Sequence, residues 1–188
     1  AIGRVVIRGG VAKAYRHRNI GRNLLHEALL RCEKFGSVVI HIQVNKEDHH
    51  AKTLLESEMF RATRRYLHLV WRAEEVPVPD IRGQYDIRSF REGDGKRLAT
   101  LQNNCFRGSW GFCPNTVEEV EAKLKLETSF PDGVLFITHR SNVVAYNWTF
   151  RNVSSGSKMG WIGMIGVDPG YRGKGFGKAV LRAGMSHL

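Results

Sequence analysis

The sequence predicts an α/β protein in which helices flank a mixed, mostly antiparallel sheet, built as two partial modules. Segments of strand composition and segments of helical periodicity follow one another along the chain. A loop-and-helix block also occurs twice, 156 residues apart as counted from Arg16 to Arg172. The stretch 73–84 carries two of the five prolines and has little periodicity, so we predict a linker there, between domains at 1–72 and 85–188.

The first domain has the predicted order strand, loop, helix, strand, helix, strand. The run at 37–44 is rich in β-branched residues and lies between Gly36 and Asn45, which is typical of a buried strand. Asp48 suits the N-cap of the helix that follows. We therefore predict strands at 3–12, 37–44 and 61–71, and helices at 20–35 and 48–58.

The second domain begins with an alternating strand at 85–90, followed by two helices. The first helix is expected to run to about Gln102, and the second from an Asn115 or Thr116 cap to about Glu127. A turn at 131–133 precedes three strands near 134–139, 143–151 and 158–167. The last two strands form a hairpin through 152–157, and a glycine-rich loop and a helix follow.

Composition limits the classes of function. Hydrophobic residues make up 42% of the chain and charged residues 25%, as in a globular protein, and no apolar run has the length of a membrane span. The net charge of +11 favours anionic ligands, but no zinc spacing or aromatic–basic pattern supports a nucleic-acid partner. The three scattered cysteines lack metal spacing and indicate reduced thiols in a cytoplasmic protein. His17, His41, His49 and His50 raise the question of a metal site. The neighbours His49 and His50 point to different faces of a helix and no third ligand is evident, so none is predicted.

The loop at 167–178 is the most informative segment. An apolar strand end, a proline turn and a glycine-rich stretch precede a helix, which leaves free backbone N–H groups where the helix dipole favours an anion. Arg172, Lys174 and Lys178 add positive charge, so a diphosphate is the expected ligand. The spacing matches neither the Walker loop nor the dinucleotide fingerprint, because Arg172 and Val180 stand where those motifs require glycine.

The remaining pattern, R-x-x-G-x-G from Arg172 to Gly177, resembles the acetyl-coenzyme-A loop of the GNAT acetyltransferases. Within that family the sequence is similar to mycothiol-synthase-like tandem proteins, through 171–188 and 110–114. The resemblance implies a GNAT fold, acetyl-CoA as cosubstrate, and pairing of the pantetheine arm with the strand that precedes the loop. The cofactor-binding residues that it implies here are Ile165, Gly166, Val167, Arg172, Gly173, Lys174, Gly175, Phe176, Gly177 and Lys178. Gly163 and Gly166 indicate either close approach of the arm or a bulged strand.

The first copy of the loop is less complete. Asn19 takes the place of Gly175, which narrows the space for a phosphate and tolerates positive φ less well. The first copy is therefore either a weaker site or a mainly structural remnant. Its candidate cofactor-binding residues are Val11, Arg16, Asn19, Gly21 and Arg22.

The resemblance implies direct attack of an amine on the thioester, so the predicted function is N-acetyl transfer from acetyl-CoA to a small-molecule or peptide amine. The usual acid and base are missing: 159–167 holds no carboxylate, and Leu55 and Met59 stand at the family's tyrosine and glycine positions. The catalytic residues are therefore unassigned, with Tyr146 and Asp168 as unsupported candidates. The alternative is a non-catalytic acyl-CoA-binding or structural module, and a basic nucleic-acid-binding protein is a third class.

Residues 1–72 resemble the second half of a GNAT module and 85–188 the first part of the next. Half a module leaves a sheet edge and helix faces uncovered. Either the polypeptide is longer at both ends, or 37–72 completes the sheet begun by 85–167, within one chain or between the chains of a dimer.

Overall fold

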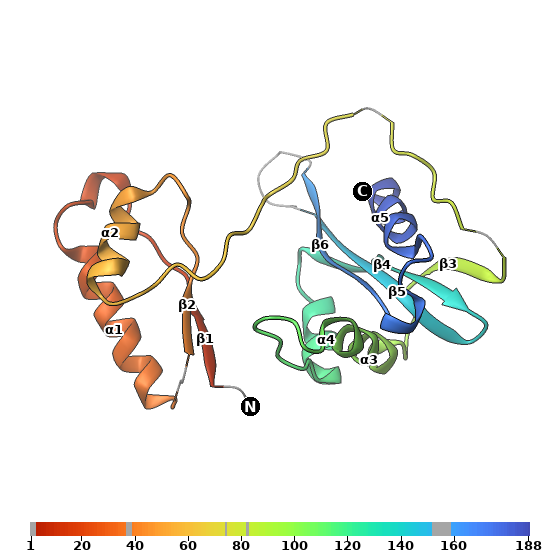
Figure 1. Ribbon diagram of the computed structural model, residues 1–188, viewed down its shortest axis with the longest axis horizontal. Helices are drawn as coiled ribbons and strands as arrows, with labels where there is room; N and C mark the ends of the chain where they lie inside the picture. Colours follow the sequence, from red (N-terminus) through yellow and green to blue (C-terminus); the bar gives the residue numbers. More distant parts are fainter. Residues whose placement is uncertain (1–2, 37–38, 74, 82, 152–158) are drawn as a thin grey trace. The chain divides into compact units, whose positions relative to one another are not determined.

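The protein divides into two compact units, Ala1–Val70 and Trp71–Leu188, in the computed structural model (Figure 1). The structure describes residues 3–36, 39–73, 75–81, 83–151 and 159–188. The predicted hairpin connection at 152–157 and the start of the strand predicted at 37–44 lie outside these residues.

Unit 1 is a parallel strand pair with two helices. β1 pairs with β2 from Arg4↔Val39 to Ile7↔Ile42. The helices pack together, because a Cβ built at Gly21 of α1 would lie 3.7 Å from Leu54 of α2. The elements are β1 (Arg4–Ile7), η1 (Lys13–Tyr15), α1 (Ile20–Lys34), β2 (Val39–Ile42) and α2 (His49–Ser57). Both strands are shorter than predicted.

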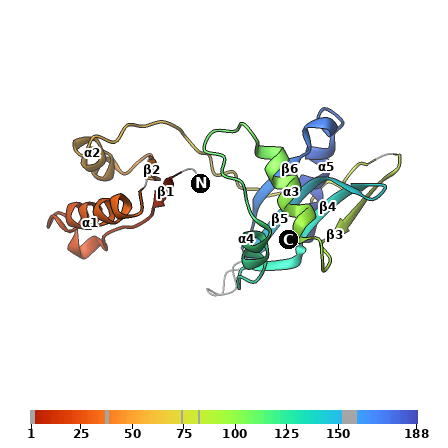
Figure 2. The same cartoon turned by 90° about the horizontal axis from the view of Figure 1, so that it is seen from below.

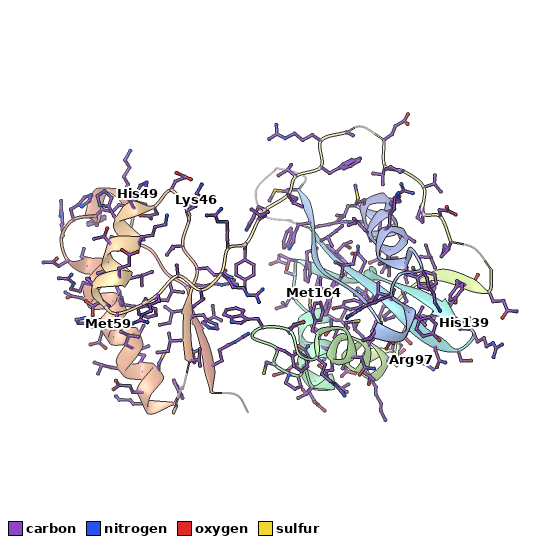
Figure 3. All side chains as sticks on the ribbon, in the orientation of Figure 1. Lys46, His49, Met59, Arg97, His139 and Met164 are labelled. Carbon is purple, nitrogen blue, oxygen red and sulfur yellow. The ribbon has the colours of Figure 1, made fainter. Side chains whose placement is uncertain are left out.

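The Asp48 cap of α2 is confirmed, since its carboxylate accepts a hydrogen bond of 2.9 Å from the Ala51 amide. At the other end Met59, labelled in Figure 3, adopts φ 65°, and the Phe60 amide donates to the Leu55 carbonyl at 2.9 Å. This is the Schellman ending, in which glycine is usual because the left-handed residue has little room for a side chain. Met59 takes that conformation at the position where the family pattern has glycine.

The strand predicted at 61–71 is wrong. Residues 60–73 have no regular structure, and Leu67 and Leu69 are 77% and 89% exposed. Strand composition reflects how side chains fit a pleated, half-buried surface rather than a preference of the backbone alone. A strand also needs a neighbour for its amides and carbonyls, and no described strand pairs with this segment.

Unit 2 is a four-stranded antiparallel sheet in the order β3-β4-β5-β6. Helices α3 and α4 cover one face of the sheet and α5 the other (Figures 1 and 2). Phe136, Tyr146 and Trp148 anchor the core under α3 and α4, while Phe176 and Val180 anchor the core under α5. The elements are β3 (Tyr85–Ser89), α3 (Gly95–Phe106), α4 (Val117–Leu124), β4 (Ser129–His139), β5 (Asn142–Arg151), β6 (Gly160–Val167), η2 (Pro169–Tyr171) and α5 (Phe176–His187).

The turn predicted at 131–133 is wrong, because these residues lie inside β4. The register with β5 shifts between Ser129↔Phe150 and Val134↔Trp148, so the extra residues form an irregularity in the strand. Thr149 Oγ1 donates to the Gly133 carbonyl at 2.9 Å and closes this irregularity against β5. Proline and glycine are therefore accommodated by a bulge, which is one of the few places where a sheet accepts them.

Of the two helices that cover this face of the sheet, α4 begins with a side-chain cap, whereas the N-cap residue of α3, Asp94, makes no capping hydrogen bond with its side chain. Thr116 is the cap of α4, in a capping box with Glu119, which decides between the two predicted caps. Before α3, the buried Asp94 carboxylate accepts from Arg88 at 2.6 and 3.1 Å, from the Arg91 amide at 2.9 Å and from Arg97 at 3.0 Å. The hydrogen bond from Arg88 is the main reason that the pKa of Asp94 is lowered to about 2.

Replacing Asp94 by Asn should lower the free energy of unfolding by about 3 kcal/mol at pH 7, because Arg88 loses its partner in a half-buried site. The pKa of Asp94 is lower in the folded than in the unfolded state. The ionised carboxylate therefore stabilises the folded protein above pH 3.8, the pKa in the unfolded state, and this contribution is lost as the pH falls towards about 2. Urea unfolding at pH 7 and at pH 3 measures both effects. The exposed Asp86→Asn is the matched control, and an equal loss in the two variants would contradict this role for Asp94.

Candidate functional site

The candidate site is the loop that joins β6 to α5. The Asp168 carboxylate accepts from the Gly170 amide at 3.0 Å, and the Tyr171 amide donates to the Asp168 carbonyl at 2.8 Å, which closes η2. The chain then passes through two left-handed residues, Gly173 at φ 77° and Gly175 at φ 84°. Gly175 is the N-cap of α5 and supplies no side chain to the helix end.

The backbone amides of this loop are free. The first amide of α5 with an acceptor belongs to Ala179, which donates to the Gly175 carbonyl at 3.1 Å. Within the described residues, no protein acceptor takes a hydrogen bond from the six amides between Gly173 and Lys178. No acidic side chain lies in the first turn of α5. The positive end of the helix therefore has an uncompensated cluster of donors.

The two left-handed glycines border open space. A Cβ built at Gly173 or at Gly175 would meet nothing within 4 Å. In unit 1 the corresponding residues, His17 at φ 61° and Asn19 at φ 59°, adopt the same left-handed conformation with side chains present. The backbone shape alone thus does not require glycine, and in unit 2 the glycines keep the space above the amides clear.

Arg172 has a structural role that differs from the sequence-based expectation of a charge over the amides. Its Nε donates to the Val167 carbonyl at 3.3 Å, and its Nη2 donates to the Cys105 carbonyl at 2.8 Å. The guanidinium therefore ties the loop to the ends of β6 and α3. Lys174 lies with Nζ 5.1 Å from the centre of the Tyr171 ring, in cation–π contact, and Lys178 is exposed.

The open edge of β6 leads into the loop. The Asp168 amide donates to the Val144 carbonyl at 2.9 Å, so these two residues form a hydrogen-bonded pair of the antiparallel ladder. Because such pairs alternate, Gly166 bonds to Tyr146, whereas Ile165 and Val167 direct their backbone groups away from β5. In the described sheet β6 has no second neighbour, and the Val167 carbonyl already accepts from Arg172.

Two of the three glycines of β6, Gly163 and Gly166, are explained by packing beneath the sheet. Trp148 pairs with Met164 and Thr149 with Ile162, so Gly163 is the extra residue of a bulge. A Cβ at Gly163 would overlap the Phe150 ring, and one at Gly166 would lie 2.7 Å from Tyr146 and 2.9 Å from the Cys105 sulfur. Of the two sequence-based readings, the bulged strand is correct for Gly163. Met164, labelled in Figure 3, lies on the same side of β6 and contacts Gln102.

A cavity of about 410 Å³ lies beside the loop. Its lining comes from the loop, from α5, from the segment at 80–81 and from the first residue of β3. The lining residues are Asp80, Ile81, Tyr85, Lys174, Gly175, Phe176, Lys178, Ala179 and Arg182. Asp80, Tyr85 and Arg182 were missed by sequence reasoning, although a comparison of the two copies along the helix could have found Arg182.

The loop of unit 1 repeats two of the hydrogen bonds of the loop of unit 2. The Tyr15 amide donates to the Ala12 carbonyl at 2.9 Å, and Arg16 Nε donates to the Val11 carbonyl at 3.0 Å. Arg18 lies 5.7 Å from the Tyr15 ring centre, as Lys174 does above Tyr171. The Gly21 position is also matched, because built Cβ atoms at Gly21 and Gly177 would lie 3.7 Å from Val11 and 3.8 Å from Val167. The repeat seen in the sequence is therefore a repeat of backbone structure.

The groups considered for proton transfer do not meet in this site. Tyr146 is fully buried, and burial raises its pKa well above the usual range. Burial likewise raises the pKa of the Cys105 thiol to about 12. Asp168 is used in the turn of η2. Among the described residues no three His, Cys, Asp or Glu side chains gather as a metal site.

No described helix is long and apolar enough to cross a membrane. The three cysteines are free thiols, with Cys32 and Cys105 buried and Cys113 exposed.

The protein is thus an α/β protein with a free-amide loop at a helix N-terminus, after the last strand of its antiparallel sheet, which is an arrangement suited to an anion. The family model described as "Acetyltransferase (GNAT) family" matches residues 95–188, which is half of the chain. The chain therefore belongs to the GNAT family of acetyltransferases.

Curated relatives and a solved structure agree with this assignment. The mycothiol acetyltransferase of Amycolatopsis mediterranei is 27% identical over 190 residues, covering 95% of this chain and 60% of the relative. That of Thermobispora bispora is 28% identical over 122 residues, covering 60% and 40%. The GCN5-related N-acetyltransferase of Sphaerobacter thermophilus shares the fold, with a TM-score of 0.74 at 18% identity over 98% of this chain and 59% of that one. The chain thus spans about 40–60% of the length of these proteins.

Replacing Gly166 by Val should destabilise unit 2 by about 2 kcal/mol, because the new side chain overlaps Tyr146 and Cys105 in a packed core. The control is Gly170→Ala, where a Cβ meets only Asp168 Oδ1 at 3.4 Å and the expected change is below about 0.5 kcal/mol. Chemical unfolding followed by tryptophan fluorescence measures both variants. Equal stability of the Gly166 variant and the wild-type protein would show that the space beneath β6 is not filled as described.

Proposed function

We propose that unit 2 binds acetyl-CoA at the β6–α5 loop and belongs to an enzyme that transfers the acetyl group to an amine. The observation that carries the proposal is the set of six free amides, from Gly173 to Lys178, at the positive end of α5. Such a cluster stabilises a diphosphate through hydrogen bonds and through the helix dipole together. The open space at Gly173 and Gly175 gives the phosphate groups room to approach the backbone.

In this proposal β6 orients the rest of the cofactor. The outward backbone groups of Ile165 and the outward amide of Val167 pair with the pantetheine arm, as an added strand would pair with a sheet edge. Arg172 holds the Val167 carbonyl and thereby fixes where this pairing ends. The proposed cofactor-contacting residues are Ile165, Val167, Gly173, Lys174, Gly175, Phe176, Gly177 and Lys178, while Gly166 and Arg172 support them.

The chemistry follows from the thioester. A neutral amine attacks the acetyl carbonyl, a new C–N bond forms, the attacking nitrogen loses a proton and the C–S bond breaks. The coenzyme thiolate leaves and takes up a proton. Unit 2 contributes by holding the thioester along β6, which lowers the entropic part of the barrier. The proton transfers need groups besides Tyr146 and Asp168, since the first is buried and the second is held in the turn.

For unit 1 we propose a weaker anion site at Val11, Arg16, Asn19, Gly21 and Arg22. The side chains of His17 and Asn19 stand where unit 2 has glycine, and the His17 ring packs against His50 with ring centres 4.7 Å apart. These side chains leave less room above the amides than in unit 2.

One observation favours a second candidate function, that of a non-catalytic acyl-CoA-binding module. The run 160–167 contains no carboxylate, and the family's tyrosine and glycine positions in unit 1 hold Leu55 and Met59. Cofactor binding would then serve structure or regulation rather than transfer.

The organisation that we propose is the second half of one GNAT module at 1–72, a linker at 73–84 and the first part of another module from 85 onwards. Open sheet edges in each unit call for completion, either by further polypeptide or by a second copy of the chain. Gel filtration combined with intact-mass measurement tests this, because a monodisperse monomer of 188 residues would contradict completion by a second copy.

Replacing Gly175 by Glu should abolish acetyl-CoA binding, since a carboxylate enters the open space above the amides and repels the diphosphate. Asn19→Glu should change the affinity by less than about threefold, because that loop already carries side chains. Calorimetric titration with acetyl-CoA measures both variants, and circular dichroism checks that both are folded. Equal losses in the two variants would contradict the proposed ranking of the sites.

The release of coenzyme A thiol in the presence of an amine panel tests transfer itself. Amine-dependent release above the rate of hydrolysis supports the enzyme, whereas tight binding without release supports the non-catalytic module. The absence of acetyl-CoA binding to the wild-type protein would overturn both.

A further inference from the structure

A row of three cations, one every four residues, runs from the loop into α5: Lys174 lies in the loop directly before the helix, and Lys178 and Arg182 lie on the helix. Lys178 and Arg182 are spaced i, i+4, so they project from the same side of successive turns. Like charges at this spacing destabilise a helix, and cations near the positive end of the dipole do so as well. The arrangement is unfavourable for the isolated protein and becomes favourable when an anion binds beside it.

Unit 1 shows an anion on the equivalent residues. Arg18 in the first loop and Arg22 and His26 of α1 stand 156 positions before Lys174, Lys178 and Arg182. There the Glu58 carboxylate bridges the last two, with Oε1 3.4 Å from Arg22 Nε and Oε2 3.0 Å from His26 Nε2. A single carboxylate thus contacts both the second and the third residue of this row.

In the described part of unit 2, the equivalent Lys178 and Arg182 lack a carboxylate partner of this kind. Within the part of the chain that the structure describes, neither Lys178 nor Arg182 forms an ion pair. Arg182 Nη1 donates to the Val78 carbonyl at 3.2 Å, which holds the guanidinium beside the 410 Å³ cavity and leaves its other N–H groups for a ligand. The residues that line the cavity include these three cations and a single carboxylate, that of Asp80.

We propose that Lys178 and Arg182 form a second anion site in unit 2, which takes a phosphate monoester in the position that Glu58 holds in unit 1. One helical turn, about 5.4 Å, separates the two cations, and the free amides lie directly before them. A guanidinium and an ammonium together suit the oxygens of a phosphate. This proposal rests on the proposed function where the ligand is the cofactor's own 3′-phosphate. A separate phosphate is the other source of the same chemistry.

The experiment compares the affinities of coenzyme A and 3′-dephospho-coenzyme A by calorimetry at low ionic strength. The wild-type protein should prefer coenzyme A by about tenfold, as expected for one charge-assisted contact. In Arg182→Gln and in Lys178→Gln this ratio should fall towards one. Arg182→Lys keeps the charge and should retain most of the preference. Lys125→Gln removes an exposed charge at the end of α4 and should leave the ratio unchanged.

A parallel titration with inorganic phosphate distinguishes the sources. One outcome identifies a separate phosphate as the ligand. In it, the wild-type protein binds coenzyme A and 3′-dephospho-coenzyme A equally well, and its affinity for inorganic phosphate falls at least fivefold in Arg182→Gln and in Lys178→Gln. The proposal is overturned if both variants keep the wild-type ratio and the wild-type phosphate affinity. If the wild-type protein binds dephospho-coenzyme A but shows no preference and no phosphate binding, the second site fails while the diphosphate loop stands. If it binds neither coenzyme, the proposed function fails and the phosphate titration still decides this site.

Discussion

The site depends on the passage from β6 into α5 through two left-handed residues. This turn precedes the first turn of α5, and among the described residues the six amides from Gly173 to Lys178 have no internal acceptor. Around the turn, Asp168 closes η2 and Arg172 ties the chain to β6 and α3. The sheet and the helices of unit 2 can be understood as the support that holds this short segment in place.

A comparison of the loops of unit 1 and unit 2 distinguishes the features that maintain the backbone structure from those that would serve a ligand. Both loops share the same turn, the same arginine-to-carbonyl bond and the same cation above a tyrosine. They differ at the left-handed positions, where one copy has His17 and Asn19 and the other has glycine. They also differ in charge balance along the helix, where Glu58 contacts Arg22 and His26 of the first copy. Differences within a preserved framework point to binding rather than to folding.

Local signals in the sequence predicted most of the elements. The Asp48 and Thr116 caps and the helices that they begin follow from side chain-to-amide hydrogen bonds, which involve residues only three positions apart. The strand expected at 61–71 failed because strand formation depends on a distant neighbour that composition does not specify. The bulges at 131–133 and at Gly163 were missed or left open for the same reason, since only the register with β5 defines them.

The site was predicted in part. The glycine spacing identified the amides, but it could not foresee that Arg172 would turn towards the Cys105 carbonyl, which lies 67 positions earlier in the chain. Asp80 and Tyr85 likewise line the cavity only because the segment before β3 and the first residue of β3 lie beside α5 in the folded protein. Contacts of this kind have no pattern along the sequence.

The hydrogen bonds of Arg172 have a thermodynamic consequence. Since they join the loop to β6 and to α3 before any ligand arrives, the six amides are already preorganised, and little conformational entropy remains to be lost on association. A loop of this kind should behave as a rigid receptor whose affinity reflects its fixed dipoles more than induced fit.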